Sequence, residues 1–458
     1  MASGGSGRSN RRQQQQQQSH QHALAQPPLP FESLLNAPVR IYPPDAFRAA
    51  AVAASPLMQA LLSMNKQIAV VGVMSTNYDS VEAAYAFANR LIGKYAFHAD
   101  EMNAACVSAK DSTPLLASVH LYFDSTKPCV YLLGIARPEN QCFGRDATGE
   151  DIAAFEKEKL KMQLLMHSSC NMLFAMHESP RVQTTVLKEV RALASEKQQV
   201  LSQLATSSSS SKGSKREKSG SASINPFTPG RCVPLVLYAV PAPDNVLTST
   251  LKSASSKSTR SATVAYCKAL ETKLTNLFRS LRGGVVGSVR MRDTLTATNL
   301  SKERRAFNVD PTHCVVIVSR RLVAEEGGLE ASLEAVLDGT GFPDLDGDAD
   351  KEEDLDALLR PLEDDDIGFP RAQQYLNKCV DLLLSSSGSF APSGASFGER
   401  GGSSKEAVRI ELLSLSQWLK AFHSLTKTMH RMEVKRKQDA ANALEQSIYQ
   451  YEQGELYQ

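Results

Sequence analysis

The hydrophobic pattern up to Arg321 alternates between two periods. Short, continuous apolar runs are typical of strands that are buried on both faces of a sheet. Such runs lie at residues 66–74, 119–123, 129–135, 171–176, 233–240 and 314–318. The second and third runs are separated by a short segment rich in turn-forming residues, which predicts an antiparallel hairpin.

Between these runs, apolar residues recur at intervals of three and four, which is the spacing of an amphipathic helix. The helices predicted in this way cover residues 81–92, 152–166, 182–204 and 262–281. Strands that alternate with helices of this length indicate an α/β fold, in which helices flank both faces of a mostly parallel sheet.

After Arg321 the clear apolar patterns are helical. They lie at residues 329–337, 355–362, 372–384 and 410–429, and a charged, helix-prone tail without a sustained heptad follows at 432–457. A short pair of helices buries too little apolar surface to stand alone. We therefore expect this helical region to pack against the preceding domain or against a partner.

Low-complexity tracts divide the chain, because they are too polar to offset the entropy of ordering. The sequence predicts a disordered N-terminus (1–45), an α/β domain (46–325) with disordered loops near 205–230 and 245–262, and a helical region (326–458) with acidic and Gly/Ser-rich linkers. Basic residues near Lys215 and Lys257 leave open an RNA-associated scaffold. Solvated loops are preferred, since no aromatic residue is interleaved for base stacking.

Composition adds exclusions to this picture. The 51 Lys and Arg residues nearly balance the 49 Asp and Glu residues, so attraction to nucleic acid is not a property of the whole chain. No secretory signal follows the basic N-terminus, and the apolar stretch at 49–62 is too short to span a bilayer, so we expect a cytoplasmic protein without membrane contact. The eight cysteines form no C-x-x-C pair, which favours reduced, buried thiols over a zinc site.

The loop after the first predicted strand occupies the position at which α/β proteins bind phosphate. A phosphate loop requires G-x-x-x-x-G-K-[ST], and alignment from Gly72 places Asn77, Tyr78 and Asp79 at the last three positions. The lysine is missing, and an aspartate stands where the Mg²⁺-binding hydroxyl belongs, so charge repulsion opposes phosphate. We interpret the loop as a degenerate phosphate loop without a cofactor, or as an ordinary turn in which Ser75 or Thr76 caps the helix.

Other catalytic patterns are also missing from the sequence. The segment after the third strand carries no aspartate of the Walker B type, and the acidic stretch at 344–350 does not match the spacing of a calcium loop. His167 and His177 flank a strand without a carboxylate nearby in sequence, so a core or edge position is favoured over catalysis. We therefore expect no catalytic residues and no metal site, and predict that the protein is not an enzyme.

Several sequence blocks resemble a known family by their order and spacing. The blocks are IAVVGV (68–73), KPCVYLL (127–133), EKLKMQLL (158–165), NMLFAMHE (171–178), CVPLVLY (232–238), ALETKLTNLFRS (269–280), FNVDPTHCVVIV (307–318), YLNKCVDLLL (375–384) and SQWLKA (416–421). Together they are similar to the N-terminal, GTPase-like part of the eighth SMG factor of nonsense-mediated mRNA decay.

This resemblance implies a GTPase-like domain with little or no hydrolytic capacity. It implies a regulatory subunit that pairs with the ninth SMG factor and, with it, restrains and positions the SMG phosphatidylinositol-kinase-like protein kinase, which links it indirectly to the mRNA surveillance machinery. Longer members continue into a Cys- and His-rich region that this sequence does not contain. The ninth factor typically keeps a phosphate loop, so residues 77–79 favour the eighth; a nucleotide-binding sibling or an atypical GTPase remains the alternative.

Overall fold

The fold is described from a computed structural model of the 458-residue chain. The structure describes residues 38–43, 66–75, 82–98, 115–124, 126–137, 148–177, 184–209, 225, 227–241, 256–289, 305–318, 369–385 and 412–455. The helices predicted at 329–337 and 355–362 lie outside these residues.

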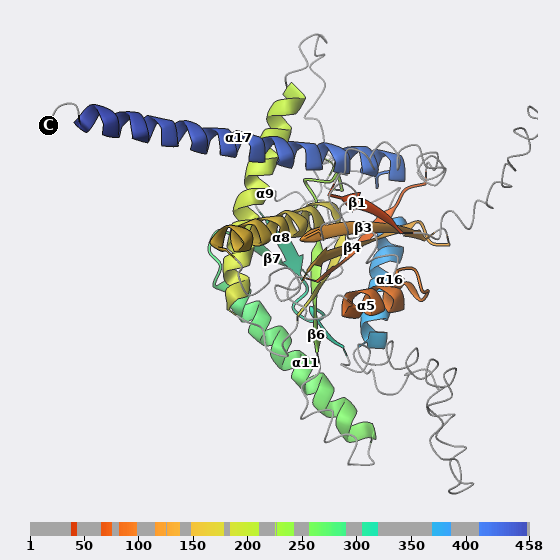
Figure 1. The fold of residues 1–458 in the computed structure, drawn as a ribbon. Coiled ribbons are helices and arrows are strands. Elements are labelled where there is room, and N and C mark those ends of the chain that lie inside the picture. Colours follow the sequence, from red (N-terminus) through yellow and green to blue (C-terminus); the bar gives the residue numbers. More distant parts are fainter. Residues whose placement is uncertain are drawn as a thin grey trace, which may run out of the picture.

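Within the described residues, nine strands form one sheet (Figure 1). They are β1 (Val39–Tyr42), β2 (Ala69–Ser75), β3 (Ala117–Asp124), β4 (Cys129–Ala136), β5 (Met172–Met176), β6 (Leu235–Pro241), β7 (Val286–Ser288), β8 (Phe307–Val309) and β9 (Val315–Val318). Their order is β1-β3-β4-β2-β5-β6-β8-β7, with β9 also paired to β6.

The sheet is mostly parallel, as the alternating pattern predicts. The pairs β2–β4, β2–β5, β5–β6, β6–β9, β6–β8 and β7–β8 are parallel. The exceptions are the two antiparallel pairs that β3 makes with β4 and β1, and the first of these confirms the predicted hairpin. All six predicted strands are present, with ends that differ from the prediction by a few residues.

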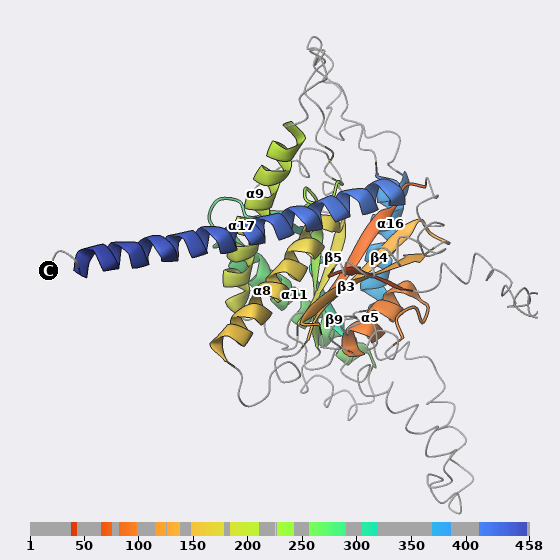
Figure 2. The same ribbon diagram turned by 45° about the horizontal axis from the view of Figure 1, so that its top comes forward.

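Six helices are described, and they cover both faces of the sheet (Figures 1 and 2). They are α5 (Glu82–Ile92), α8 (Gly149–Ser169), α9 (Thr185–Ser209), α11 (Ser256–Arg279), α16 (Phe369–Ser385) and α17 (Leu415–Glu455). One apolar cluster joins α5 and α16 to one face of the sheet, and the other joins α8, α9, α11 and the first half of α17 to the opposite face. The four helices predicted before Arg321 are thereby confirmed.

Small residues on the central strands let α8 approach the sheet closely. Gly72 lies in the middle of β2, and a Cβ atom added there would come within 2.6 Å of the Cys170 Sγ atom. Gly134 on the neighbouring β4 is similar, because its Cβ atom would come within 2.7 Å of the Met162 Sδ atom. Both glycines are therefore required for packing, since protein interiors leave no room for an added methyl group.

The two C-terminal helices belong to the same core as the sheet. The Ile68 amide donates a hydrogen bond of 3.0 Å to the Leu413 carbonyl oxygen, just before α17 begins. Trp418 is 1% exposed and donates its indole N–H to the Ser169 carbonyl oxygen at the end of α8, at 3.2 Å. On the opposite face, Tyr375 of α16 donates to the Asp310 carboxylate at 3.0 Å. The sequence pattern predicts that this region packs on the preceding domain or on a partner; α16 and the first half of α17 pack on the sheet, within its two apolar clusters.

Three predicted boundaries are wrong. Strand β1 lies within the segment expected to be disordered at 1–45, α11 begins at Ser256 within the loop expected near 245–262, and α9 extends to Ser209. For β1 the cause is tertiary, because this strand pairs with β3 and its sequence alone carries little strand signal. Among the helices of the described segments, none is both long and apolar enough to cross a membrane.

Candidate functional site

The predicted phosphate-binding position lies at the carboxyl edge of the sheet. In open α/β sheets, ligands bind where the connections of two adjacent parallel strands leave toward opposite faces. Here β2 leads to α5 on one face, and its neighbour β5 leads to α9 on the other. The point at which these connections diverge therefore lies beyond Ser75 and Met176, and residues 76–81 directly follow Ser75 in the sequence.

The described part of this edge shows where two of the expected residues lie. Gly72 is inside β2, paired to Leu132 and Leu173 on either side, and it serves the packing of α8. Ser75 is the last residue of β2, and the described part of α5 begins seven residues later, at Glu82. Asn77, Tyr78 and Asp79, like the alternative cap Thr76, lie outside the described residues.

The described edge is mostly apolar. The described strands that end there finish at Ser75, Ala136, Met176, Pro241 and Val318. The following His177 is half-buried, with its ring 5.2 Å from the Tyr238 ring, and desolvation lowers its pKa to about 4, so it is neutral at pH 7. Within the described ranges, no cluster of three or more His, Cys, Asp or Glu residues could hold a metal ion.

His167 is a core residue, as predicted. Its Nδ1 atom lies 2.8 Å from the Gln163 carbonyl oxygen, and burial lowers its pKa to about 3. The described cysteines are buried and free, in agreement with the predicted reduced thiols; they are Cys129, Cys170, Cys232, Cys267, Cys314 and Cys379. Burial raises their pKa where a shift is resolved, so these thiols are poor nucleophiles.

A buried lysine that the sequence analysis did not select joins three parts of the fold. The Lys197 Nζ group on α9 donates to the carbonyl oxygens of His167 at 3.2 Å and Ala306 at 3.0 Å, and to that of Cys232. Burial lowers the pKa of Lys197 to about 7. A lysine in the apolar stripe of α9, three residues after Ala194, is the signal that could have revealed it. Because Lys197 is 2% exposed and donates to three carbonyl oxygens, we assign it a structural role.

The main described surface of functional interest is on α17. The tail that the sequence analysis treats as a separate helix-prone segment continues α17 into one helix of 41 residues. Figures 1 and 2 show that its first half lies across α8 and α9, whereas its second half projects beyond the body of the protein. Glu433 marks the transition, since its carboxylate pairs with Lys157 and, at 2.6 Å, with Lys161 of α8.

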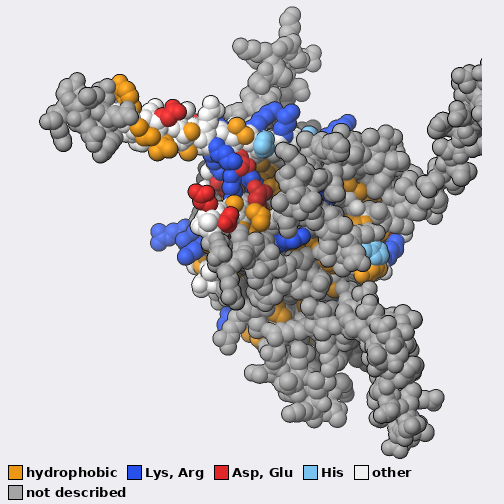
Figure 3. Space-filling view, viewed as in Figure 1, with side chains coloured by type: hydrophobic (Ala, Val, Ile, Leu, Met, Phe, Trp, Pro, Cys, Tyr) orange, Lys and Arg blue, Asp and Glu red, His pale blue; other side chains and the backbone are white. Residues whose placement is uncertain are grey.

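The projecting half of α17 exposes large apolar side chains. Leu444 and Tyr449 are each 62% exposed, and Val434 and Ile448 are each 49% exposed. Leu444 and Ile448 are four residues apart and Val434 is fourteen before Ile448, so all three share one side of the helix. Figure 3 shows orange hydrophobic side chains along one side of this projection. A helix with an uncovered apolar stripe is typical of a protein-binding surface.

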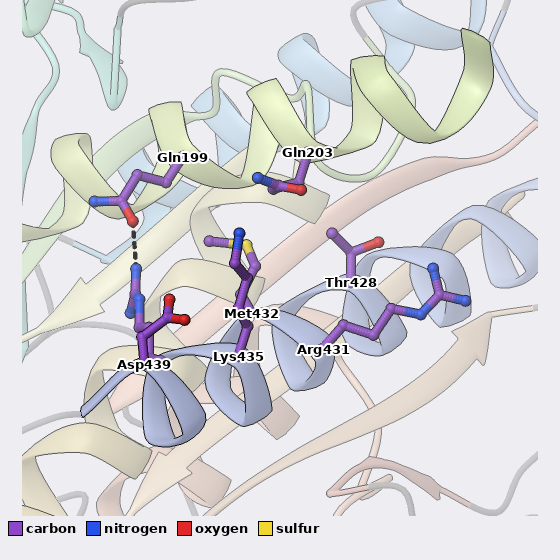
Figure 4. A pocket seen from close by; sticks show the side chains of 8 residues that line it. Gln199, Gln203, Thr428, Arg431, Met432, Lys435 and Asp439 are labelled. Atoms are coloured by element: carbon purple, nitrogen blue, oxygen red, sulfur yellow. Dashed lines mark hydrogen bonds between the residues drawn. The ribbon is translucent and has the colours of Figure 1, made fainter. Parts of the chain in front are cut away.

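A second surface feature is a groove between α9 and α17, here named the α9–α17 groove. It has a volume of about 400 Å³ and is lined by Gln199, Gln203, Thr428, Arg431, Met432, Lys435, Arg436 and Asp439. Figure 4 shows Gln199 and Gln203 on α9 facing Met432 and Lys435 on α17. Its polar lining of amides and cations suits a charged ligand better than an apolar one.

Comparison with protein-family models gave no match, and neither did comparison with curated proteins.

Proposed function

We propose that this chain is a cytoplasmic, non-catalytic regulatory subunit in nonsense-mediated mRNA decay. In this proposal it binds the ninth SMG factor and the SMG phosphatidylinositol-kinase-like protein kinase, and it modulates the activity of that kinase. Its link to the mRNA surveillance machinery is indirect, through these two partners.

The fold supports the GTPase-like part of this proposal. The strands β3-β4-β2-β5-β6-β9 lie side by side in that order, and β3 alone among them runs antiparallel to the rest. In this order the antiparallel β3 pairs with β4, and β1 lies beyond it. We take the arrangement of β3 to β9 as the one expected of a GTPase-like sheet. The domain would then supply a scaffold, with the degenerate phosphate loop, Gly72 to Asp79 in the sequence, at the end of its central strand.

The projecting half of α17 is the observation that carries the binding function. Leu444 and Ile448 present an apolar stripe on a helix held only by its first half, because burial ends near Met432 and Glu433. An apolar helix face that no described residue covers gains free energy when a partner protein buries it. A regulatory subunit that acts by contact requires such a surface, whereas a hydrolase requires a reactive centre.

Co-purification tests this function. The tagged full chain is co-expressed with the ninth SMG factor and the kinase, and both are expected in the eluate. The variant L444E/I448E is expected to lose at least one of them, since two carboxylates would have to be buried at the contact. The matched control I152E changes an apolar residue that is 47% exposed on α8 and is expected to keep both.

The outcomes separate the function from its surface. If the unaltered chain retains neither partner, the proposed function fails. If L444E/I448E retains both partners as well as I152E does, the contact lies elsewhere on the protein. Calorimetry with GTP and with ATP in the presence of Mg²⁺ tests the alternative: a flat titration is expected, and saturable binding favours the nucleotide-binding sibling or an atypical GTPase.

A further inference from the structure

The exposed face of α17 carries a row of cations over its docked half. Lys420, Lys427, Arg431 and Lys435 are all exposed, and their spacing of seven, four and four residues places them on one side of the helix. The row extends over about 22 Å, because each helical residue rises about 1.5 Å. We name these four residues the α17 basic row.

The second half of the α17 basic row borders the α9–α17 groove. Arg431 and Lys435 line the groove, and neither forms an ion pair with another described residue. The neighbouring Arg436 differs, since its Nη2 atom lies 2.8 Å from a Glu196 carboxylate oxygen and also contacts Gln199. Asp439 is the acidic residue that lines the groove. Arg431 and Lys435 are thus the cations with capacity for an external anion.

Neutral hydrogen-bonding groups complete the groove. Gln199 and Gln203 of α9 lie opposite the side of α17 that carries Thr428, as Figure 4 shows. Amide groups can donate to a carboxylate or to the carbonyl oxygen of an extended peptide, and they can also accept from a peptide N–H. Figure 3 shows blue Lys and Arg side chains gathered where α17 crosses the helices beneath it.

We propose that the α9–α17 groove and the α17 basic row bind an extended, acidic segment of a partner protein, rich in Asp and Glu. Charge complementarity selects an anionic occupant, and the length of the row suits an extended chain of about seven residues at roughly 3.3 Å each. Single-stranded RNA is disfavoured because the groove lining contains no Phe, Tyr or Trp on which bases could stack. The partner need not be either SMG protein, so this surface stands apart from the proposed function.

Fluorescence anisotropy tests the acidic-segment site on the full chain. The probe is a labelled twelve-residue peptide of Asp, Glu and Gly, and binding is expected to weaken as NaCl rises from about 50 to about 300 mM, since exposed charges are screened. The variant R431E/K435E is expected to lose about tenfold or more in affinity, because two attractive contacts become repulsive. The control K268E/K273E makes the same change of charge at exposed positions on α11 and is expected to bind normally.

Three outcomes would overturn the acidic-segment site. One is an equal loss of affinity in R431E/K435E and K268E/K273E, which would indicate attraction to overall charge. Another is that a labelled twelve-nucleotide RNA binds more tightly than the peptide and that R431E/K435E no longer binds this RNA, which would identify a nucleic-acid surface. The third is peptide binding only after the acidic residues of 344–366 are changed to Asn and Gln, which would make this chain's own segment the occupant. Native Trp418 fluorescence in each variant confirms that the fold is intact.

Discussion

Replacement of Leu425 by alanine tests how firmly α17 is docked. Leu425 is 0% exposed and belongs to the apolar cluster that also contains Trp418 and Phe422. It approaches the backbone closely, since a Cβ atom at Gly230 would lie 3.5 Å from the Leu425 Cδ1 atom. The substitution removes this side chain from the centre of the contact between α17 and the body.

The expected cost follows from complete burial. A buried Leu→Ala change costs about 2–5 kcal/mol, the sum of lost apolar transfer and the cavity left behind. Because Leu425 is fully buried, we expect about 3 kcal/mol. At a denaturant dependence of about 3 kcal/mol per molar urea, the unfolding midpoint would fall by about 1 M. The matched change Leu444→Ala on the same helix, at a position 62% exposed, should cost under about 0.5 kcal/mol.

The protein supplies its own probe for this measurement. Trp418 is the single tryptophan of the sequence and lies on the same helix as Leu425, about two turns before it. Its emission therefore reports the docking of α17 directly. Urea unfolding is followed by this emission for the unaltered chain, L425A and L444A. Equal midpoints for L425A and L444A would refute the reasoning, because they would mean that the first half of α17 is no better packed than its projecting half.

Three other predictions follow from the core and from the α8–α17 contact. Gly72→Ala should destabilise the fold by about 1–3 kcal/mol, measured by urea unfolding, because the new methyl group meets the Cys170 Sγ atom. Burial lowers the pKa of His120 and His167 to about 3, below the value near 6.5 of an unfolded chain. Between these pH values the unfolded chain binds more protons than the folded one, so stability should fall as the pH drops from about 6.5 toward 3. Acid titration followed by Trp418 emission measures this. Glu433→Gln should weaken the contact with α8 by at most about 1 kcal/mol, and less in high salt, measured by urea unfolding at two ionic strengths.

Each of these predictions has a contrary result. The prediction for Gly72→Ala is contradicted if this variant unfolds at the same urea concentration as Gly93→Ser. At Gly93 an added Cβ atom has no neighbour within 4 Å, and the only strain comes from φ, which is +74°. The histidine prediction is contradicted if the double variant H120N/H167N loses stability with acid over the same range and to the same extent. A loss in E433Q that is unchanged by salt would show that packing, and not charge, holds that contact.

The sequence predicts the core strands well because burial on both faces leaves an uninterrupted apolar signal. The runs at 66–74 and 129–135 correspond to β2 and β4, the central strands. Strands β7 and β8 have three residues each and pair at the edge, so their signal is too short to separate from a loop. The alternating pattern also fixes the α/β class, since helices and strands differ in the period of their apolar positions.

The surface of α17 could be predicted less well. Its docked half carries a clear stripe of apolar residues, but the charged tail after Met432 gives no sustained heptad, and the prediction therefore divides one helix in two. Lys197 was missed for a related reason, since its three carbonyl partners come from segments far apart in the sequence. Contacts of this kind depend on the tertiary fold and leave little local signal.

The hydrogen bond between Ile68 and Leu413 affects the order in which parts of the protein can fold during synthesis. Strand β2 lies at the centre of the sheet, yet the two residues that precede it, Gln67 and Ile68, pair with the segment that leads into α17. During synthesis from the N-terminus, the ribosome makes β2 long before α17, so the face that Trp418 covers stays open until the last described helix emerges. Until then the nascent chain exposes apolar surface, and exposed surface of this kind favours aggregation, so rapid docking of α17 protects the domain.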